Sequence, residues 1–398
     1  MNVCMLAYTF YDSDNRVMRY AETLAAYGDR VDVIALRSLD GAQESTINGV
    51  NLFGIQTRIL NESGKASYLY RLLKFLVHSA WVLWRRNRTI KYDLIHVHSV
   101  PDFLVFAAIM PKLAGAKVIL DIHDVLPELY ASKFGESNQS IAYKALLTVE
   151  RLSARFADHV IIANDLWRNR LIQRSVPPAK CTTIMNYPDC TIFRRSGRTR
   201  NDGRFVILYP GSLNWHQGLD IAIRALAKIS DRVPHVDLHI YGNGPEEQNL
   251  KALASQLGLE SRVIFRDCVS LREVAPIMEN ADLAVVPKRS NAFSNEAFST
   301  KTLEFMAMGV PLIVAATAID KYYFQDSQVM FFRPEDDDDL AAAMLKLIES
   351  PELRRELIAQ GLKFAEINDW ERKKSLYLDI VDSLTNQTHQ PVEQVGAK

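Results

Sequence analysis

Two glutamates with a lysine between them stand out in the stretch NEAFSTKTLEF, which begins at Asn295. Glu296 and Glu304 are eight positions apart, and Lys301 lies between them. Residues on one helix face meet at spacings of three, four or seven, so this pair does not fit one face of a helix. The spacing is better explained by a loop that leads into a helix.

The residues after Glu296 predict the start of that helix. Ser299 or Thr300 is a good N-cap for a helix over Thr302–Met308. Glu296 is therefore expected in the loop before the helix, and Glu304 in or near its first turn. On spacing alone a structural role is favoured, in which Glu304 offsets the helix dipole and Glu296 is a solvated loop residue.

The same arrangement also suits a sugar diphosphate. Backbone amides around Phe298–Thr300 would point towards an anion, and Lys301 would add a full positive charge. Glu296 and Glu304 could then accept hydrogen bonds from hydroxyl groups on either side. A phosphate flanked by two polyols describes a nucleotide sugar.

Alternating strands and helices must position these residues. Continuous apolar runs separated by amphipathic stretches predict parallel sheets that are covered on both faces. Clear helical patterns cover Arg16–Tyr27, Leu219–Ile229, Pro245–Leu257 and Asp338–Ile348. The strand candidates are NVCML, RVDVIAL, YDLIHVH, KVILDIH, DHVIIA and CTTIM, followed by RFVILY, VDLHIY, RVIFR, DLAVVP, PLIVAA and VMFF.

This pattern runs twice, with a break at the polar segment Phe193–Arg204, which we interpret as a linker. At 398 residues the chain is also too long for one ordinary core. We therefore expect an α/β protein with two Rossmann-like, doubly wound parallel-sheet domains that face each other across a cleft. Ligands bind such sheets at the carboxyl ends of the strands.

A glycine turn follows the strand candidate VDLHIY at such a carboxyl end. Gly242 and Gly244 allow a tight turn, and Pro245 is placed to start a helix at its first position. An anion-binding turn and an ordinary strand–helix turn both remain open for this motif.

The composition excludes several classes of function. The 47 basic side chains balance the 47 acidic ones, so no net charge draws the chain to nucleic acid. Cys4, Cys181, Cys190 and Cys268 form no metal-binding pair and indicate reduced thiols in a cytoplasmic protein. We expect no signal peptide and no membrane-spanning helix.

Two acidic motifs could suggest a metal site. Asp12–Asp14 contains two aspartates around a serine, and residues 334–340 read PEDDDDL. The acidic run is placed to open a helix, where negative charge is favourable. Short acidic triplets arise often by chance, so we expect no metal ion and no other cofactor.

A basic and apolar stretch extends from Ser63 to Tyr92 without any acidic residue. Within it, residues 68–91 combine many leucines with Trp81 and Trp84. A helix of this kind can lie on an anionic membrane surface, or it can pack on a sheet with its charges in water. We expect both roles together. The positive charges are Lys65, Arg71, Lys74, Arg85, Arg86, Arg88 and Lys91.

The chain resembles the large retaining glycosyltransferase family 4, which has the GT-B fold and an E-x7-E signature. EAFSTKTLE matches that signature, and the resemblance covers nearly the whole chain. It implies an acceptor-binding domain over 1–195, a nucleotide-sugar-binding domain over 205–367, and a helix over 368–387 that crosses back to the first domain. Further matching segments are YDSDNRVMRYAETLAAYGDRVDVIAL, DLIHVHS, DIHDVLPELY, YPGSLNWHQGLDIAIRAL, YGNGPEEQNL, RVIFRDCVSLREVAPIMENADLAVVP, MGVPLIVA and WERKKSLYLDIVDSL.

The resemblance also implies roles for single residues. Glu296 would contact hydroxyls of the transferred sugar, and Glu304 would hold the ribose. His123, in the turn DIHD, would lie over the donor sugar and support the positive transition state; a capping or core histidine is the alternative. Asp124 would shape that turn. The other expected donor-binding residues are Phe298, Ser299, Thr300, Lys301, Gly211, Gly242, Gly244 and Arg289.

Two departures from the family pattern concern the diphosphate. The family often has G-R-x(4)-K-G, but Ser212 and Gln217 stand where its arginine and lysine would be. Lys301 is the leading substitute, with Lys288, Arg289 and His216 behind it. The Gly-Gly loop near the N-terminus is replaced by YDSDNRV, where we expect Arg16 to cap a helix, with a phosphate contact as the alternative.

Together these features predict a metal-independent, retaining glycosyltransferase that moves a sugar from a nucleotide sugar to a glycan or polyprenyl-linked acceptor. Such transfer develops a cation and an anionic leaving group, and both must be stabilised. Bacterial surface polysaccharide synthesis is the expected setting, in the cytoplasm or at the cytoplasmic face of the inner membrane. A sugar-nucleotide epimerase on the same fold and a non-catalytic partner protein are the alternatives.

Overall fold

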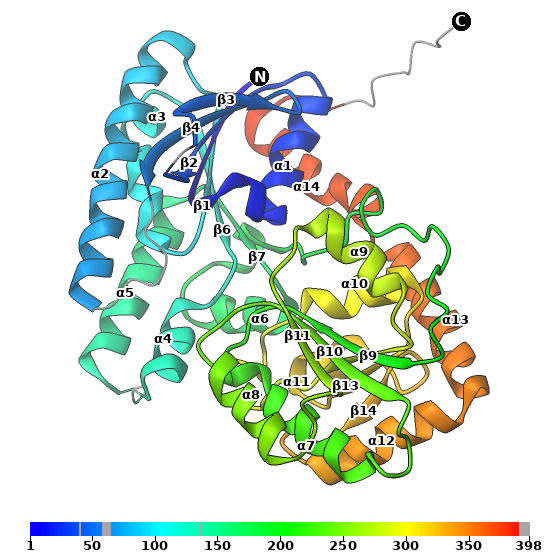
Figure 1. The fold of residues 1–398 in the computed structure, drawn as a ribbon. Helices are drawn as coiled ribbons and strands as arrows, with labels where there is room; N and C mark the ends of the chain where they lie inside the picture. The colour runs from blue at the N-terminus through cyan, green and yellow to red at the C-terminus, as the bar shows by residue number, and fades with distance from the viewer. Residues whose placement is uncertain (40, 58–64, 136, 138, 390–398) are drawn as a thin grey trace, which may run out of the picture. The chain divides into compact units, whose positions relative to one another are not determined.

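The computed structural model describes residues 1–39, 41–57, 65–135, 137 and 139–389, without the side chains of residues 65 and 66. The chain forms two compact units. The first unit contains Met1–Asn186 and the chain from Lys374 onwards, and the second contains Tyr187–Lys373. Each unit is built around one sheet with helices on both faces (Figure 1).

The first sheet has eight strands in the order β3-β4-β2-β1-β5-β6-β7-β8. All neighbours pair in parallel except β3 and β4. The chain order reverses on either side of β1, which pairs with β2 and β5. The strands are β1 (Asn2–Phe10), β2 (Arg30–Arg37), β3 (Glu44–Ile47), β4 (Val50–Thr57), β5 (Leu94–His98), β6 (Lys117–Ile122), β7 (His159–Ile162) and β8 (Cys181–Thr183).

The helices of the first unit cover this sheet. The expectation that Arg16 caps the first helix is wrong, because Asp14 is its N-cap and accepts hydrogen bonds from two backbone amides of the first turn. The helices are α1 (Asn15–Ala26), α2 (Lys65–Ile90), α3 (Ile109–Leu113), α4 (Leu126–Phe134), α5 (Ile141–Phe156), α6 (Asp165–Arg174) and, from Lys374 onwards, α14 (Trp370–Thr385).

The second sheet has six strands in the order β11-β10-β9-β12-β13-β14, and all neighbours are parallel. The strands are β9 (Phe205–Pro210), β10 (Val236–Tyr241), β11 (Val263–Arg266), β12 (Leu283–Val286), β13 (Leu312–Ala315) and β14 (Met330–Phe332). The sequence predicted all six of these strands. The predicted class of two doubly wound α/β domains is therefore confirmed.

Helices α7, α8 and α12 cover one face of the second sheet, and α9, α10 and α13 cover the other (Figure 1). Pro245 does not start a helix, because α8 begins at Glu247. The acidic run does open α12, with Asp336 as its N-cap. The helices are α7 (Leu219–Ile229), α8 (Glu247–Gln256), α9 (Leu271–Glu279), α10 (Thr300–Met308), α11 (Ala318–Tyr323), α12 (Asp337–Glu349) and α13 (Pro351–Ile367).

The polar segment Phe193–Arg204 lies within the second unit. The Glu279 carboxylate at the end of α9 accepts hydrogen bonds from the backbone amides of Ser196 and Gly197, and Asn280 accepts one from Arg200. These bonds fasten the segment to the second unit. In the described part of the chain, the helices are too short or too polar to cross a bilayer.

Candidate functional site

In the first unit, polar side chains gather where β5 and β6 end. His98 is the last residue of β5 and lies in register with Asp121 of β6, and His123 follows β6 directly. Both Asp121 oxygens accept 2.7 Å hydrogen bonds from the Arg16 guanidinium of α1. His98 Nδ1 and His123 Nε2 each lie 3.2 Å from Asp121 Oδ2. One buried carboxylate thus orients two imidazoles.

Burial and the Arg16 charge act in opposite directions on the pKa of Asp121. Burial raises the pKa of Asp121, but the charge of Arg16 and the two histidine contacts lower it well below its usual range. Burial lowers the pKa of His98, against the effect of its bond to Asp121. An ionised carboxylate only accepts hydrogen bonds, so a bond from His123 requires the proton on Nε2. The Nδ1 atom of His123 is then left for another partner.

His123 lies on the wall of an open pocket of about 240 Å³ at the carboxyl ends of β1, β5 and β6. Its side chain is 19% exposed, whereas Asp121 and His98 are buried behind it. Asp124 also lines the pocket, and its burial raises its pKa. The pocket is lined by Ala7, Tyr8, Thr9, Asp14, Tyr68, His98, Ser99, Val100, His123 and Asp124.

Two groups of described side chains have ligand atoms close enough for a metal ion, and both already have partners. In the group of His96, His98 and Asp121, Arg16 binds both carboxylate oxygens and the Tyr377 hydroxyl lies 3.0 Å from His96 Nδ1. In the group Asp336–Asp338, Lys228 pairs with two of the three carboxylates. Neither group offers a free set of ligands.

In the second unit, the predicted donor residues gather at the carboxyl ends of β9, β10 and β12. Lys301, in the first turn of α10, lies with its side chain against Gly211, the residue that follows β9. A Cβ atom at Gly211 would overlap this side chain, and Gly211 has a positive φ of 145°. The Lys301 ammonium is 5.2 Å from the centre of the Tyr209 ring. The glycine therefore makes room for the lysine.

The environment of Lys301 is partly desolvated. Burial lowers the pKa of Lys301, the charge of Glu304 opposes this shift, and Lys288 adds to it. Burial also lowers the pKa of His216, and the charge of Lys301 contributes. Glu304 itself begins the second turn of α10, since the helix starts at Thr300. The charge of Lys301 thus interacts with the Glu304 carboxylate and with the His216 imidazole.

The other basic candidates are engaged elsewhere. The Lys288 ammonium lies 2.7 Å from Asp320 and donates a 2.7 Å hydrogen bond to the Ala297 carbonyl. The Arg289 guanidinium donates two hydrogen bonds, of 2.7 and 2.8 Å, to Asp220. In contrast, no carboxylate of the described residues lies within ion-pair distance of Lys301. Of these cations, Lys301 is the one available to an anion.

The loop that carries Glu296 is fastened on both sides. Asn295 accepts hydrogen bonds from the backbone amides of Ala318 and Ile319, at 2.8 and 3.0 Å. The Phe298 ring packs against Tyr323 at a centroid distance of 5.3 Å. Its side chain therefore has a packing role, and contact of Phe298 with a donor stays a prediction.

Three hydroxyl groups near the start of α10 have no hydrogen-bond partner among the described residues. They belong to Ser294, Ser299 and Thr302, and all three oxygens are buried. Ser299 is the N-cap of α10, but its side chain makes no capping hydrogen bond. A buried hydroxyl without a hydrogen-bond partner costs free energy of folding.

Gly242 and Gly244 have a clear packing role. A Cβ atom at either position would overlap a backbone carbonyl of the loop after β9, that of Gly211 or of Leu213. The Gly211 amide donates to the Tyr241 carbonyl at 2.8 Å. Two loops therefore pack backbone against backbone, and contact of these glycines with a donor stays a prediction.

Sequence reasoning missed the roles of Asp121 and His98. Both lie in segments that it quoted, DIHDVLPELY and DLIHVHS. Their adjacent strands end together, which could have placed the two side chains side by side. Arg16 gave no such signal, because its partner lies 105 positions away.

Solved structures similar to this chain define its fold. Sucrose-phosphate synthase from Thermosynechococcus elongatus superimposes with a TM-score of 0.78 at 17% identity, over 96% of this chain and 99% of that one. The Anabaena HepE protein, solved in complex with UDP-glucose, gives 0.71 at 18% identity, over 96% and 100%. The chain has the GT-B fold.

The family follows from two sequence matches. Residues 13–186 match the glycosyl transferase 4-like domain, and residues 192–364 match the glycosyl transferases of group 1. An uncharacterized glycosyltransferase of Methanocaldococcus jannaschii is 25% identical over 74% of each chain. The α-D-kanosaminyltransferase of Streptomyces kanamyceticus is 25% identical over 70% of this chain and 74% of its own. The chain belongs to the group 1 glycosyltransferases, of the family 4 type.

Proposed function

We propose that this protein is a retaining glycosyltransferase that needs no bound metal and transfers a sugar from a nucleoside diphosphate sugar. The acceptor is a glycan or a polyprenyl-linked glycan, in bacterial surface polysaccharide synthesis on the cytoplasmic side of the inner membrane. The observation that carries the proposal is the position of Lys301. Its ammonium makes no ion pair with the described carboxylates and lies at the start of α10, against Gly211 and within the electrostatic reach of Glu304.

The start of α10 supplies what a diphosphate needs. The first amides of a helix lack partners within the helix and attract anions. Lys301 adds a full charge, and the hydroxyl of Ser299 lacks a partner among the described residues. These groups take the place of the arginine and lysine that Ser212 and Gln217 replace. Glu304 then accepts from the ribose and Glu296 from the transferred sugar.

Transfer breaks the bond between the anomeric carbon and the phosphate oxygen, and the acceptor oxygen forms the new bond. The electrons of the broken bond go to the nucleoside diphosphate, whose negative charge Lys301 and the α10 amides stabilise. The acceptor proton passes to the leaving phosphate oxygen when attack occurs on the leaving-group face. This route retains the anomeric configuration without a covalent enzyme intermediate.

His123 is assigned to the positive side of the transition state. The ionised Asp121 accepts a hydrogen bond from Nε2–H, which leaves Nδ1 as an acceptor for a sugar hydroxyl. An imidazole backed by a carboxylate can support the positive charge that develops on the sugar.

Helix α2 gives a surface for membrane binding. Large apolar side chains on it are exposed, including Leu73 at 45%, Val77 at 68% and Trp81 at 50%. Arg85 and Arg88 are also exposed and lie over the rings of Trp81 and Trp84. An apolar stripe flanked by basic residues suits the surface of an anionic bilayer, which is where a polyprenyl-linked acceptor would be found.

Donor binding can be tested before the acceptor is known. UDP, GDP and ADP should be compared by thermal shift, because a ligand that binds only the folded state raises its stability. We expect one of them to raise the melting temperature of the wild type. Failure of all three would contradict the nucleotide site.

Release of nucleotide from the matching sugar donor should then be compared for wild type and Glu296→Ala. We expect the variant to fold and to lose turnover, because its sugar contact is removed. Wild-type turnover in Glu296→Ala would exclude Glu296 from the site.

A further inference from the structure

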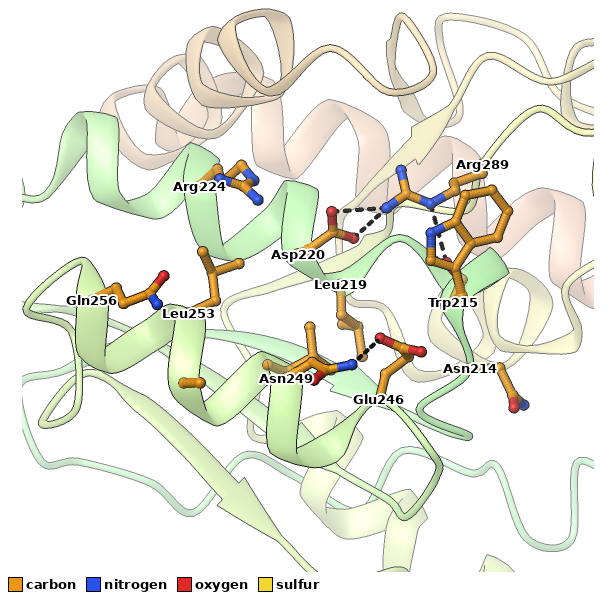
Figure 2. Close-up of a pocket in the computed structure, with 12 residues that line it drawn as sticks. Asn214, Trp215, Leu219, Asp220, Arg224, Glu246, Asn249, Leu253, Gln256 and Arg289 are labelled. Atoms are coloured by element: carbon orange, nitrogen blue, oxygen red, sulfur yellow. Dashed lines mark hydrogen bonds and ion pairs between the residues drawn. The ribbon is translucent and has the colours of Figure 1, made fainter.

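A second pocket lies in the second unit, between α7 and α8 and the loop that precedes α7 (Figure 2). Its volume is about 350 Å³. Its lining includes Trp215, Asp220, Arg224, Glu246, Asn249 and Gln256, and none of the residues from Glu296 to Glu304. We call it the α7–α8 pocket. It is therefore built from other side chains than those assigned to the transferred sugar.

Trp215 is a fixed aromatic surface at this pocket. It stands in a short turn that ends at Gly218, where a positive φ of 68° redirects the chain into α7. The Arg289 guanidinium lies 4.5 Å from the centre of the indole, and Asp220 holds that guanidinium with two hydrogen bonds (Figure 2). The cation covers one side of the ring.

Trp215 is nevertheless 57% exposed. Tryptophan is enriched among the residues that carry most of the binding energy at interfaces. Its neighbours on α7 explain why it stays open: the helix buries Leu219 and Ile223, and turns Asp220 and Arg224 outwards. The sequence thus places polar groups around the ring and no apolar cover over it.

The charges of the pocket balance. Asp220 and Glu246 are acidic, and Arg224 and Arg289 are basic. A phosphate or carboxylate ligand would meet two carboxylates, and a cationic ligand would meet two guanidinium groups. The pocket therefore favours a ligand without net charge.

The polar groups favour a ligand that both donates and accepts hydrogen bonds. Arg224, Asn249 and Gln256 are donors, and the Glu246 carboxylate accepts, already from Asn249 at 3.0 Å (Figure 2). Sugar hydroxyls do both. The C–H face of a pyranose ring is apolar and carries a small positive charge, which suits the negative face of an indole.

We propose that the α7–α8 pocket binds an uncharged oligosaccharide, with one sugar ring stacked on Trp215 and its hydroxyls bound by Glu246, Asn249, Arg224 and Gln256. This site goes beyond the nucleotide-sugar site proposed above. A glycan held there stays near the enzyme between encounters, and this raises its effective concentration.

The test is saturation-transfer NMR of the full chain with five neutral hexasaccharides. These are maltohexaose, cellohexaose, laminarihexaose, mannohexaose and chitohexaose in its N-acetylated form. We expect at least one to bind and Trp215→Ala to weaken it about tenfold or more, as for an aromatic anchor. Trp215→Phe should keep most of the binding, and Gln256→Ala should weaken it about threefold, the loss expected for one hydrogen bond.

Tyr322→Ala is the matched control, because Tyr322 is 53% exposed but lies on α11, outside the lining of the α7–α8 pocket. It should bind the hexasaccharide like the wild type. The proposal is overturned if none of the five sugars binds, if Trp215→Ala binds like the wild type, or if excess UDP displaces the sugar. If a hexasaccharide bound but none of the nucleotides raised the melting temperature, the proposed function would be contradicted and the oligosaccharide site would stand.

Discussion

The Arg16 guanidinium holds Asp121 with two hydrogen bonds of 2.7 Å, one to each carboxylate oxygen. The pair joins α1 to β6, and the two side chains are 4% and 0% exposed. His98 and His123 converge on the same carboxylate. One ion pair therefore fixes the geometry of the polar cluster in the first unit.

Arg16→Met should lower the free energy of unfolding by about 3–5 kcal/mol, because it removes the cation that is paired with the buried Asp121 carboxylate. Urea denaturation of the full chain measures this loss. The double variant Arg16→Met/Asp121→Asn is the control: it also removes the carboxylate charge and should regain part of the stability. If Arg16→Met were as stable as the wild type, the ion pair would make no net contribution to the free energy of unfolding.

Lys301→Met should weaken UDP binding about tenfold or more, which corresponds to about 1.4 kcal/mol of lost interaction. Gly211→Ala should have a similar effect, since its Cβ atom would displace the Lys301 side chain. Isothermal titration with UDP, or with the nucleotide that stabilises the wild type, measures both. Lys346→Met, on the exposed side of α12, is the matched control and should bind normally. Normal affinity in both test variants would place the diphosphate elsewhere.

Asp102 predicts a dependence of stability on pH. Burial raises its pKa to about 7, and nearby Glu150 adds to the shift. The folded state then holds a proton that the unfolded state releases near pH 4. As pH rises from 4 to 7 this group therefore costs stability, and the cost is complete above pH 7.

Asp102→Asn removes that cost and should stabilise the protein at pH 8 by up to about 4 kcal/mol, while the two proteins should be similar at pH 4. Guanidinium denaturation at both values checks this. Asp12→Asn changes an exposed aspartate and should show no such difference. If Asp102→Asn and the wild type were equally stable at pH 8, this would contradict an ionised, buried Asp102.

Replacement of Arg85 and Arg88 by glutamine should weaken binding to phosphatidylglycerol vesicles about thirtyfold in a pelleting assay, since each basic residue near an anionic surface contributes about 1 kcal/mol. Lys144→Gln/Arg155→Gln, on the exposed side of α5, removes the same charge and should pellet normally. If both double variants pelleted equally, α2 would have a packing role and no role in membrane binding.

Arg86 must be kept in that experiment. It donates a 2.7 Å hydrogen bond to the buried Asp32 and contacts the Tyr92 hydroxyl. Its pKa is raised by these bonds, although burial opposes them. Of the three neighbouring arginines, the structure thus assigns this one to folding.

The sequence predicted the sheets well because most strands are buried on both faces and appear as continuous apolar runs. Helix α7 begins and ends where its apolar period predicted, at Leu219 and Ile229. The two strands that sequence reasoning missed are β3 and β4. All four residues of β3 are exposed, so it has no apolar pattern. Its turn, Asn48-Gly49, has positive φ at both residues and was a usable hairpin signal.

The candidate site was predictable only in part. Local spacing placed Glu296 in a loop and Glu304 in a helix, because a capping signal lies between them. The engagement of Lys288 depends on Asp320, and that of Arg289 on Asp220. These partners are far apart in the sequence and are brought together by the order of the strands in the sheet. No local sequence pattern connects them. The sequence could therefore rank Lys301 first among several possible phosphate-binding cations, but it could not show that Lys288 and Arg289 have carboxylate partners.

The place of Lys301 on a helix has one further consequence. A lysine in a flexible loop loses conformational freedom when it meets a ligand, and that loss weakens binding. Here the helix backbone and the space above Gly211 restrict the side chain beforehand. A preorganised cation of this kind leaves little entropy to be lost on association.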